Sequence, residues 1–310
     1  MLPYSFTPLF LYKLQSSANT MIMKKTFYRR MPKFLIALLC LSSMLYACKT
    51  QPNVKVQTSE RITYYTPSAR NVEIDENLIP APTLSEFWSV EDVDVSAREN
   101  KKKHVAFTFD DAPTRRLPEL MSVFLEFNEN NPDCKASATI FFNGVNLNEY
   151  TLPYVKKAYE IGLELGNHTY SHCDLRKLAT FELDREISLV DEFLQKIDGN
   201  PLHLLRAPYG AVDDSVRAAA KTPILDWSVD TLDWTGISAE EICQKTLDGL
   251  EQGGIVLFHD GAKNTVQAIR MLLPILKEKN YQAVSISQLS KIHTCPLRIG
   301  GLYTRARPKK

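Results

Sequence analysis

Short apolar runs alternate with segments of helical period from residue 104 to residue 292, and few architectures allow that order. Runs with the length of buried strands occupy residues 105–109, 138–142, 163–165, 202–205, 224–229, 255–258 and 283–286. The segments that repeat apolar residues every three or four positions are 118–128, 152–161, 180–198, 214–221, 239–250 and 266–279. Strands that alternate with helices predict an α/β fold in which helices cover a mostly parallel sheet, either open and doubly wound or closed into a barrel.

The composition is compatible with such a fold. Hydrophobic residues make up 44% of the 310 residues and charged residues 24%, which is ordinary for a chain that buries a full core. The formal net charge is +1, so the chain has no overall field that would attract nucleic acid.

The first 47 residues have the features of an export signal. A basic segment at 24–33 precedes the apolar run 34–47, which is shorter than the roughly 20 residues needed to span a bilayer. Residues 1–20 fit no part of such a signal. The true start is therefore expected at Met21, Met23 or Met31. Residues 1–47 are interpreted as a signal peptide region and left out of the fold prediction.

The cysteine after this apolar run suggests an anchor. The tetrapeptide Leu45-Tyr-Ala-Cys48 resembles the processing site of bacterial lipoproteins, in which the cysteine receives lipid after cleavage, although Tyr46 is an unusual occupant of that site. Lipidation of Cys48 would anchor the protein to a membrane of the bacterial cell envelope, facing the periplasm or at the outer membrane. The alternative is simple cleavage after Ala47, which would leave a secreted, soluble protein.

The rest of the chain divides into three parts. Residues 48–102 hold scattered prolines and many polar residues, and they predict a tether. Residues 103–292 hold the alternating pattern and predict the main domain, whereas the basic residues 293–310 predict a frayed, solvated tail. An exported protein meets oxidising conditions, so four cysteines can form disulfides in three pairings that the sequence does not distinguish. They are Cys134, Cys173, Cys243 and Cys295.

Polar side chains follow five of the predicted strands, at the point where each strand ends. They are Asp110 and Asp111, His168 and His172, Arg206, Asp230 and Asp233, and His259 and Asp260. One such residue alone is usually a cap or a turn residue. In a barrel of parallel strands, however, the C-terminal ends of the strands meet on one face, where reactive side chains gather. Five such positions in succession therefore predict a functional site.

Two of these histidines, His168 and His172, have the spacing of metal ligands. Residues four apart on a helical turn face the same way, and a catalytic zinc site keeps three protein ligands plus a water. The alternative is one capping histidine and one surface histidine. A carboxylate of Asp110 or Asp111 would complete the ligand set. Neighbouring side chains on a regular strand point to opposite faces, so both carboxylates reach one site only if the strand ends there.

Five segments resemble, in order, the motifs of the polysaccharide deacetylase family, also called the NodB homology domain or carbohydrate esterase family 4. They are Thr108-Phe-Asp-Asp111, His168-Thr-Tyr-Ser-His172, Arg206-Ala-Pro-Tyr209, Asp230-Thr-Leu-Asp-Trp234 and Leu257-Phe-His-Asp260. The resemblance covers residues 103–292 as the catalytic domain and implies a distorted (β/α) barrel of about seven parallel strands with outer helices. The chain departs from the family at Ala112, where glycine is common, and in the extra residues 131–135.

The resemblance implies a metal site and a base. Asp111, His168 and His172 would bind a divalent metal, usually zinc in this family, which would polarise the acetyl carbonyl and lower the pKa of a water. Asp110 would act as the general base on that water. Arg206 would pair with Asp110 and keep it ionised, because a nearby opposite charge favours the carboxylate.

The resemblance also implies an acid and a substrate pocket. His259 would be the general acid that protonates the leaving amine, and Asp233 would hold it in its cationic form. The backbone N–H of Tyr209 would help to hold the tetrahedral oxyanion. Trp234 and Leu257 would line a small apolar pocket for the acetyl methyl group.

The activity implied by the resemblance is removal of N-acetyl groups from a glycan with release of acetate. Residues 227–234 are most similar to members that act on N-acetylglucosamine polymers such as peptidoglycan and chitin. The alternative activity is removal of O-acetyl groups from xylan, which would use the same catalytic residues and is not excluded by the motifs. A third alternative is a non-catalytic surface lipoprotein that binds glycan, and it predicts the loss of a ligand or of the acid. The predicted metal ligands and the predicted acid are all present in this sequence.

Overall fold

The computed structural model describes Trp88 and residues 93–307. The predicted signal peptide, the lipidation site at Cys48 and most of the predicted tether lie outside the described residues. No helix in the described part of the chain combines the length and the hydropathy needed to cross a membrane.

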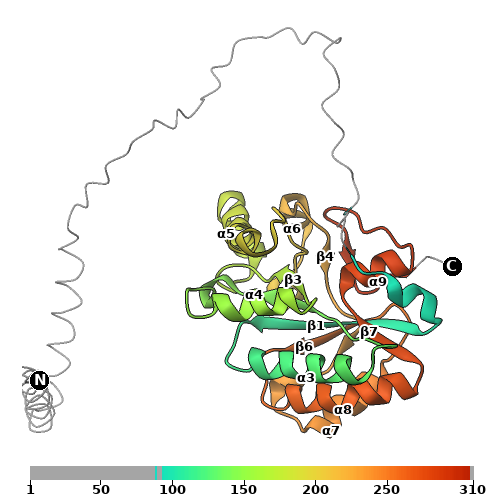
Figure 1. The fold of residues 1–310 in the computed structure, drawn as a ribbon. Helices are drawn as coiled ribbons and strands as arrows, with labels where there is room; N and C mark the ends of the chain where they lie inside the picture. The colour runs from blue at the N-terminus through green and yellow to red at the C-terminus, as the bar shows by residue number, and fades with distance from the viewer. Residues whose placement is uncertain (1–87, 89–92, 308–310) are drawn as a thin grey trace, which may run out of the picture. The chain divides into compact units, whose positions relative to one another are not determined.

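A parallel sheet forms the centre of the domain (Figure 1). Its strands are β1 (Lys103–Ala112), β2 (Thr139–Phe142), β3 (Glu164–Asn167), β5 (Val229–Asp230), β6 (Ile255–His259) and β7 (Tyr281–Val284). They lie in the order β3-β2-β1-β6-β5, and β7 pairs with the first half of β1. Every one of these pairings is parallel, as the alternation of strands and helices predicts.

Single bridges continue the sheet toward closure. Leu205 bridges Asn167 at the end of β3 on one side and Ile224 on the other, both in parallel. Ile224 begins β4 (Ile224–Leu225), and after three residues outside any strand the chain enters β5, which pairs with β6. The pairings and bridges therefore form a ring that is interrupted between β4 and β5, which are joined along the chain but not paired with each other. This arrangement is compatible with the distorted barrel that was expected. The distortion is that 202–205 contributes a single bridging residue and that 224–229 splits into two short strands.

Helices cover the outside of the sheet. Figure 1 shows α3, α7 and α8 on one side of β1 and β6, and α4, α5 and α6 on the other. The helices are α3 (Leu117–Asn130), α4 (Leu152–Glu160), α5 (Thr180–Asp198), α6 (Asp214–Ala219), α7 (Ala239–Asp248), α8 (Thr265–Glu278) and α9 (Ile286–Ile292). Short 3₁₀ turns are η1 (Ser96–Asn100), η2 (Gly144–Asn146), η3 (Leu175–Lys177), η4 (Pro208–Gly210) and η5 (Asp233–Thr235).

Local sequence explains where several helices begin and end. The α7 helix begins with a capping box, in which Ser238 and Glu241 each bond the other's backbone N–H. The α5 helix ends at Gly199, which adopts a left-handed conformation (φ 81°) that glycine reaches without steric cost. The helix segments predicted from apolar periodicity match the observed helices to within three residues at either end.

The two faces of β1 have different surroundings. Val105, Phe107 and Phe109 pack toward the helices, and the ring of Phe258 lies 5.0 Å from Phe107 and 5.3 Å from Phe109. The alternate face carries Thr108 and Asp110, which are both buried. A strand that is buried on both faces is typical of parallel sheets. Here, however, one face is polar toward its C-terminal end, and this polarity marks the site.

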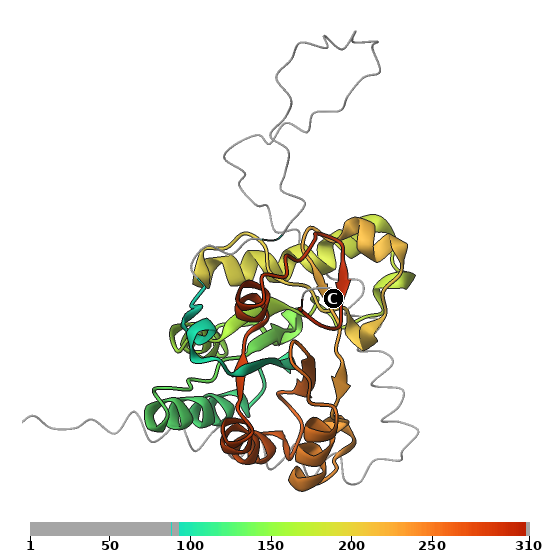
Figure 2. The same ribbon diagram turned by 90° about the vertical axis from the view of Figure 1, so that its right-hand side faces the viewer.

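The C-terminal segment, dark red in Figure 2, packs against the domain. Its strand β8 (Leu302–Tyr303) pairs with β4, and both Leu297 and Ala306 are fully buried. The side chain of Arg305 pairs with Glu251. The prediction of a frayed tail is therefore wrong for residues 293–307, because two apolar side chains and a strand pairing fix a segment whose composition is basic.

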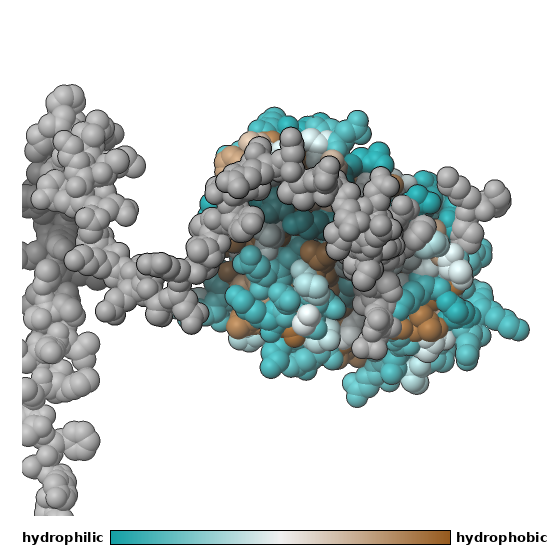
Figure 3. Space-filling model, turned by 90° about the horizontal axis from the view of Figure 1, so that it is seen from above, coloured by the Kyte–Doolittle hydropathy of each residue, from teal (hydrophilic) through white to brown (hydrophobic). Residues whose placement is uncertain are grey.

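The last residues of the predicted tether also contact the domain. Ala97 in η1 is buried, and its carbonyl bonds the ring Nε2 of His104 at 3.1 Å. The backbone N–H of Trp88 donates to Leu297 O. The four described cysteines, whose pairing was left open, are all free thiols. Seen from above, the surface is mostly hydrophilic, with hydrophobic side chains in scattered groups (Figure 3).

Candidate metal centre and active site

The C-terminal ends of the strands bring the predicted site residues together. Asp110 and Asp111 lie near the end of β1, His168 directly follows β3, and His259 is the last residue of β6. Arg206 follows the bridging residue of the ring. This clustering arises because parallel strands all end on the same face of a barrel. Cys48, the predicted lipidation site, lies outside the described residues.

Asp111, His168 and His172 form a candidate metal site, since their ligand atoms all lie within 4.8 Å of one another. Oδ1 of Asp111 lies 3.6 Å from Nε2 of His168 and 3.4 Å from Nε2 of His172. His168 is buried, whereas the other two side chains are partly exposed, so the group opens toward solvent on one side. Two imidazoles, one carboxylate and an open side match a catalytic zinc site.

The protonation of His168 suits this role. Its Nδ1 lies 2.8 Å from the carbonyl oxygen of Arg206, an acceptor only, so Nδ1 carries the hydrogen and donates. The lone pair of Nε2 is then free for a metal. Ligating histidines commonly donate their second nitrogen in this way, which fixes both the ring orientation and the tautomer. The donor set and its orientation therefore fit a divalent metal.

A bulge explains how two consecutive carboxylates face one site. Both carboxylates were expected to reach one site only if the strand ended there, but β1 continues through Ala112. Its register with β2 shifts between Phe109 and Ala112, and Asp111 adopts a left-handed conformation (φ 64°). An extra residue in one strand redirects the side chains beside it. Asp111 therefore turns toward the histidines while Asp110 keeps pointing into the barrel.

Asp110 is buried and paired with Arg206. Its Oδ1 accepts a hydrogen bond of 2.9 Å from Nη1 of Arg206, and its Oδ2 lies 3.7 Å from Nε2 of His168. Burial alone would raise the pKa of Asp110, but the charge and the hydrogen bond of Arg206, together with the charge of His259, outweigh it, so the pKa lies below its ordinary value. Asp110 is therefore ionised in this site.

Arg206 is fully buried and satisfies its donors inside the barrel. Besides Asp110, it donates to Oγ1 of Thr108 at 2.7 Å and to the carbonyl oxygens of Leu225 and Asp226 at 3.2 and 3.1 Å. A planar guanidinium with several fixed donors holds a carboxylate in one orientation better than a flexible ammonium would. The predicted contact between Arg206 and Asp110 is thus present.

His259 is held by the buried carboxylate of Asp233. The His259 Nδ1 lies 2.8 Å from Oδ1 of Asp233, and the His259 backbone N–H donates to Oδ2 at 2.8 Å. Thr265 donates to the same Oδ2 at 2.5 Å. Burial lowers the pKa of His259, but the hydrogen bond and the charge of Asp233, helped by Asp110 and Asp111, outweigh it and raise the pKa. The protonated, cationic form of His259 is therefore favoured by this environment.

The three residues predicted to contact substrate differ in exposure. Tyr209 is 71% exposed and left-handed (φ 63°), and its ring contacts the ring of His172 at 4.8 Å. Trp234 is 62% exposed, so it is a surface residue next to Asp233 and not part of the core. Leu257 is buried in β6. Tyr209 thus lies directly beside a metal-ligand candidate.

Asn167, the last residue of β3, was not among the residues predicted from the sequence. It is fully buried, and its Oδ1 accepts from the backbone N–H of Thr169 at 2.9 Å, within the turn that carries His168 and His172. Its Nδ2 donates to Ile187 O at 2.9 Å. The available signal was a polar residue at the buried end of a strand, directly before a predicted metal ligand.

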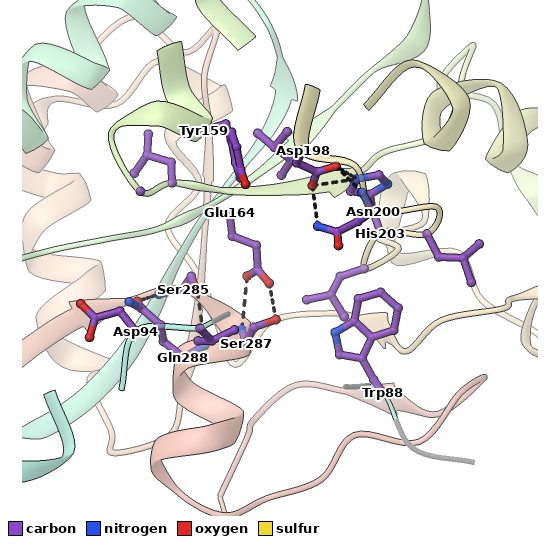
Figure 4. A pocket seen from close by; sticks show the side chains of 16 residues that line it. Trp88, Asp94, Tyr159, Glu164, Asp198, Asn200, His203, Ser285, Ser287 and Gln288 are labelled. Atoms are coloured by element: carbon purple, nitrogen blue, oxygen red, sulfur yellow. Dashed lines mark hydrogen bonds and ion pairs between the residues drawn. The ribbon is translucent and has the colours of Figure 1, made fainter. Parts of the chain in front are cut away.

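A pocket of about 210 Å³ lies away from these residues (Figure 4). Its lining includes Glu164, Asp198 and His203, together with Trp88. Glu164 begins β3, so this pocket lies toward the N-terminal end of that strand, whereas His168 follows the C-terminal end. None of the predicted site residues lines it. The convergence of ionisable groups, and not the presence of this cavity, identifies the active-site candidate.

Comparison with known proteins agrees with this geometry. The family model described as polysaccharide deacetylase matches residues 97–223. A peptidoglycan-N-acetylglucosamine deacetylase from Bacillus cereus is 32% identical over 200 residues, which cover 61% of this chain and 89% of that relative. This chain belongs to the polysaccharide deacetylase family. The family predicted from the five motifs is confirmed.

Two further members of the polysaccharide deacetylase family define the extent of the match. The peptidoglycan-N-acetylmuramic acid deacetylase PdaC of Bacillus subtilis is 29% identical over 191 residues, or 62% of this chain, and the chain spans only 39% of that relative's length. A solved structure described as a T48 deacetylase with substrate has a TM-score of 0.60 and 28% sequence identity. The match covers 68% of this chain and 99% of the solved one, which confirms the α/β fold class.

Proposed function

We propose that this chain is a metal-dependent hydrolase that removes N-acetyl groups from an N-acetylglucosamine-type glycan and releases acetate. The observation that carries the proposal is the convergence of three candidate metal ligands with two separately paired groups, an ionised carboxylate and a histidine of raised pKa. Pairs of titratable groups whose pKa values are driven in opposite directions are typical of acid–base sites.

The residues that would hold the metal are Asp111, His168 and His172. When bound, a divalent cation, for which Zn²⁺ is the best candidate with these ligands, polarises the acetyl carbonyl and lowers the pKa of water. His168 is pre-oriented for this role by its hydrogen bond to Arg206 O. The exposed side of the group leaves room for the acetyl group of a polymer that approaches from solvent.

Asp110 takes the proton of the attacking water. It is suited to this step because Arg206 keeps it ionised and oriented while it stays buried beside the ligands. A positioned base of this kind contributes roughly 10²- to 10⁴-fold to a rate. Arg206 acts through Asp110 and holds the base in place.

His259 gives a proton to the leaving nitrogen. Its Nδ1 is engaged by Asp233, so the opposite ring nitrogen, Nε2, is the one that donates. The raised pKa of His259 keeps a larger share of the ring protonated near neutral pH than an unpaired histidine would have. Without this proton the amine would leave as an unstable anion.

The remaining predicted residues would receive the acetyl group. The backbone N–H of Tyr209 would hold the developing oxyanion, because its left-handed conformation turns the chain beside His172. Trp234 and Leu257 would provide the apolar wall for the methyl group. The preference for N-acetylated glycans over acetylated xylan rests on the resemblance of residues 227–234 and on relatives whose names specify peptidoglycan.

The proposed location is the bacterial cell envelope, with a lipid anchor at Cys48. The basic segment, the apolar run and the cysteine at its end support this proposal. Expression with a labelled fatty acid would test it, since Cys48→Ala should lose both the label and the association with membranes. Label that persists in Cys48→Ala would contradict the anchor.

The activity is tested by acetate release from peptidoglycan, chitooligosaccharides and acetylxylan, offered in parallel to residues 49–310. We expect release from an N-acetylated glycan that a chelator abolishes and added Zn²⁺ restores. Release from acetylxylan alone would replace the proposed reaction with ester hydrolysis. No release from any of the three, with zinc bound, would refute the proposed substrate class.

A further inference from the structure

The turn that carries the metal-ligand candidates has an unusual backbone. Thr169 and His172 both have positive φ values, of 65° and 57°, although neither is glycine. Such conformations are unfavourable for residues other than glycine and persist only where the surrounding contacts hold the backbone in place. The positions of His168 and His172 therefore depend on what holds this turn from outside.

The α5 helix supplies the contacts that hold the turn. The backbone N–H of Tyr170 donates to Glu186 O at 2.8 Å. The carboxylate of Glu186 accepts from the backbone N–H of Ser171 at 2.7 Å and from its hydroxyl at 2.9 Å. These contacts fix the outer half of the turn, between the two histidines.

Asn167 fixes the inner half of the turn. Its Oδ1 accepts from Thr169 N, and its Nδ2 donates to Asp191 Oδ1 at 2.9 Å as well as to Ile187 O. Both ends of this amide are therefore engaged, which sets its orientation. The amide connects the turn to a carboxylate that the sequence places on the buried face of α5.

Asp191 is unusual at its position. It lies on the helix face that carries Ile187, Val190 and Leu194, and its side chain is almost completely buried. A buried carboxylate is costly unless it is paired. Its partner is His203, whose Nδ1 lies 3.0 Å from Asp191 Oδ1.

His203 in turn bonds a second carboxylate. Its Nε2 lies 3.2 Å from Oδ2 of Asp198, at the end of α5, as Figure 4 shows. Burial lowers the pKa of His203, but hydrogen bonds and charges from Asp191 and Asp198 outweigh this and raise the pKa to about 9. The ring is therefore cationic at neutral pH. Leu204, the next residue, accepts from the backbone N–H of Asn167.

We propose that Asp191, paired with His203, is a positioning residue for the metal site, which acts through the Asn167 amide on the turn that carries His168 and His172. The competing explanation is that Asp191 and His203 only fasten residues 199–204 to α5. The two explanations differ in one respect. An interaction that only attaches residues 199–204 to α5 contributes to stability alone. A positioning residue also determines the affinity and the geometry of the metal site. The inference rests on the proposed metal site.

The test measures Zn²⁺ affinity of the full chain by competition with a chromogenic chelator. Asp191→Asn should weaken Zn²⁺ binding about tenfold, at the lower end of the effect of partners that orient ligands. His203→Gln should weaken it in the same direction. The matched control is Asp184→Asn on the same helix, which removes an exposed carboxylate paired with Lys221 and should leave the affinity unchanged.

A second readout separates positioning from stability. With Co²⁺ in place of Zn²⁺, the visible absorption bands report ligand geometry, and Asp191→Asn should change their shape while Asp184→Asn should not. Asn167→Ala should weaken Zn²⁺ binding, and Asp191→Asn should add little on top of it, because both act through one amide. If Asp191→Asn lowers thermal stability but leaves Zn²⁺ affinity and the Co²⁺ bands unchanged, the inference is wrong. If the unaltered chain binds no Zn²⁺, the proposed metal site fails and the inference fails with it.

Discussion

Replacing Asp233 by asparagine tests how the pKa of His259, the proposed general acid, is set. Asp233 is almost completely buried, and it contacts the His259 ring at 2.8 Å. The substitution removes the charge while keeping the size of the side chain. Because Asp233 raises the pKa of His259, its loss should lower that pKa. At a given neutral pH a smaller fraction of His259 would then carry the proton that the leaving nitrogen needs.

The size of the effect follows from the contact. Hydrogen bonds to charged groups contribute about 1.5–3 kcal/mol, and each 1.4 kcal/mol is tenfold in rate. Asp233→Asn should therefore lower kcat about 10- to 100-fold near neutral pH. The alkaline limb of the kcat/KM profile should move to lower pH, because the protonated form of His259 is the active one and it would be lost earlier.

The assay is acetate release from a chitooligosaccharide across the pH range, with Thr265→Val as the comparison. Thr265 donates to the same carboxylate, so Thr265→Val removes one hydrogen bond and leaves the charge in place. It should shift the alkaline limb less than Asp233→Asn does. An alkaline limb that stays at its original pH in Asp233→Asn would refute the assignment of His259 as an acid tuned by Asp233.

Four further substitutions test other parts of the reasoning. Asp111→Ala should abolish stoichiometric zinc in metal analysis of the purified protein, and retained zinc would remove this residue from the ligand set. Asp110→Asn should keep the zinc but lower kcat by about 100-fold or more, so near-normal turnover would show that the base lies elsewhere. Arg206→Met should cost about 3–5 kcal/mol of unfolding free energy in neutral chelator-treated protein. That cost should shrink in acid, because the pKa of Asp110 is lowered in the folded protein. The stability gained from its ionised form is complete above the ordinary pKa of an aspartate and is lost as the pH falls through the lowered pKa. A cost that is equal at all pH values would indicate lost packing alone. Phe109→Ala should cost about 3–5 kcal/mol in urea unfolding at any pH, because its ring packs against Phe258 in the core, and a much smaller loss would contradict that packing.

The fold and the candidate metal-site positions could be predicted from the sequence because both depend on the local order of residues along the chain. Apolar periodicity located six of the seven α-helices in the described part of the chain and missed α9. The positions of polar residues after strands placed His168, Arg206 and His259 on one face. These inferences need only the rule that parallel strands end together. No contact between distant segments had to be known.

The features that were missed depend on contacts between distant segments. The left-handed bulge at Asp111 arises from a register shift against β2, which no local pattern reveals. The C-terminal segment has a basic composition, yet β8 pairs with β4 and Ala306 is fully buried. Asp191 reads as an irregularity on an apolar helix face until Asn167 and His203 are placed beside it.

The buried contacts of Arg206 contribute both to the stability of the fold and to the ionised state of Asp110. An apolar interior would leave Asp110 buried without a partner, and a carboxylate in that position would bind a proton and cease to be a base. The guanidinium of Arg206 compensates the charge, and it also fills the barrel against Phe141, whose ring centre lies 4.3 Å away. Because its remaining donors bond Thr108, Leu225 and Asp226, the ion pair cannot rotate. Site dipoles that are fixed before the reaction need no reorganisation as charge develops. The same buried contacts that hold the strands together therefore fix the orientation of Asp110, the proposed base.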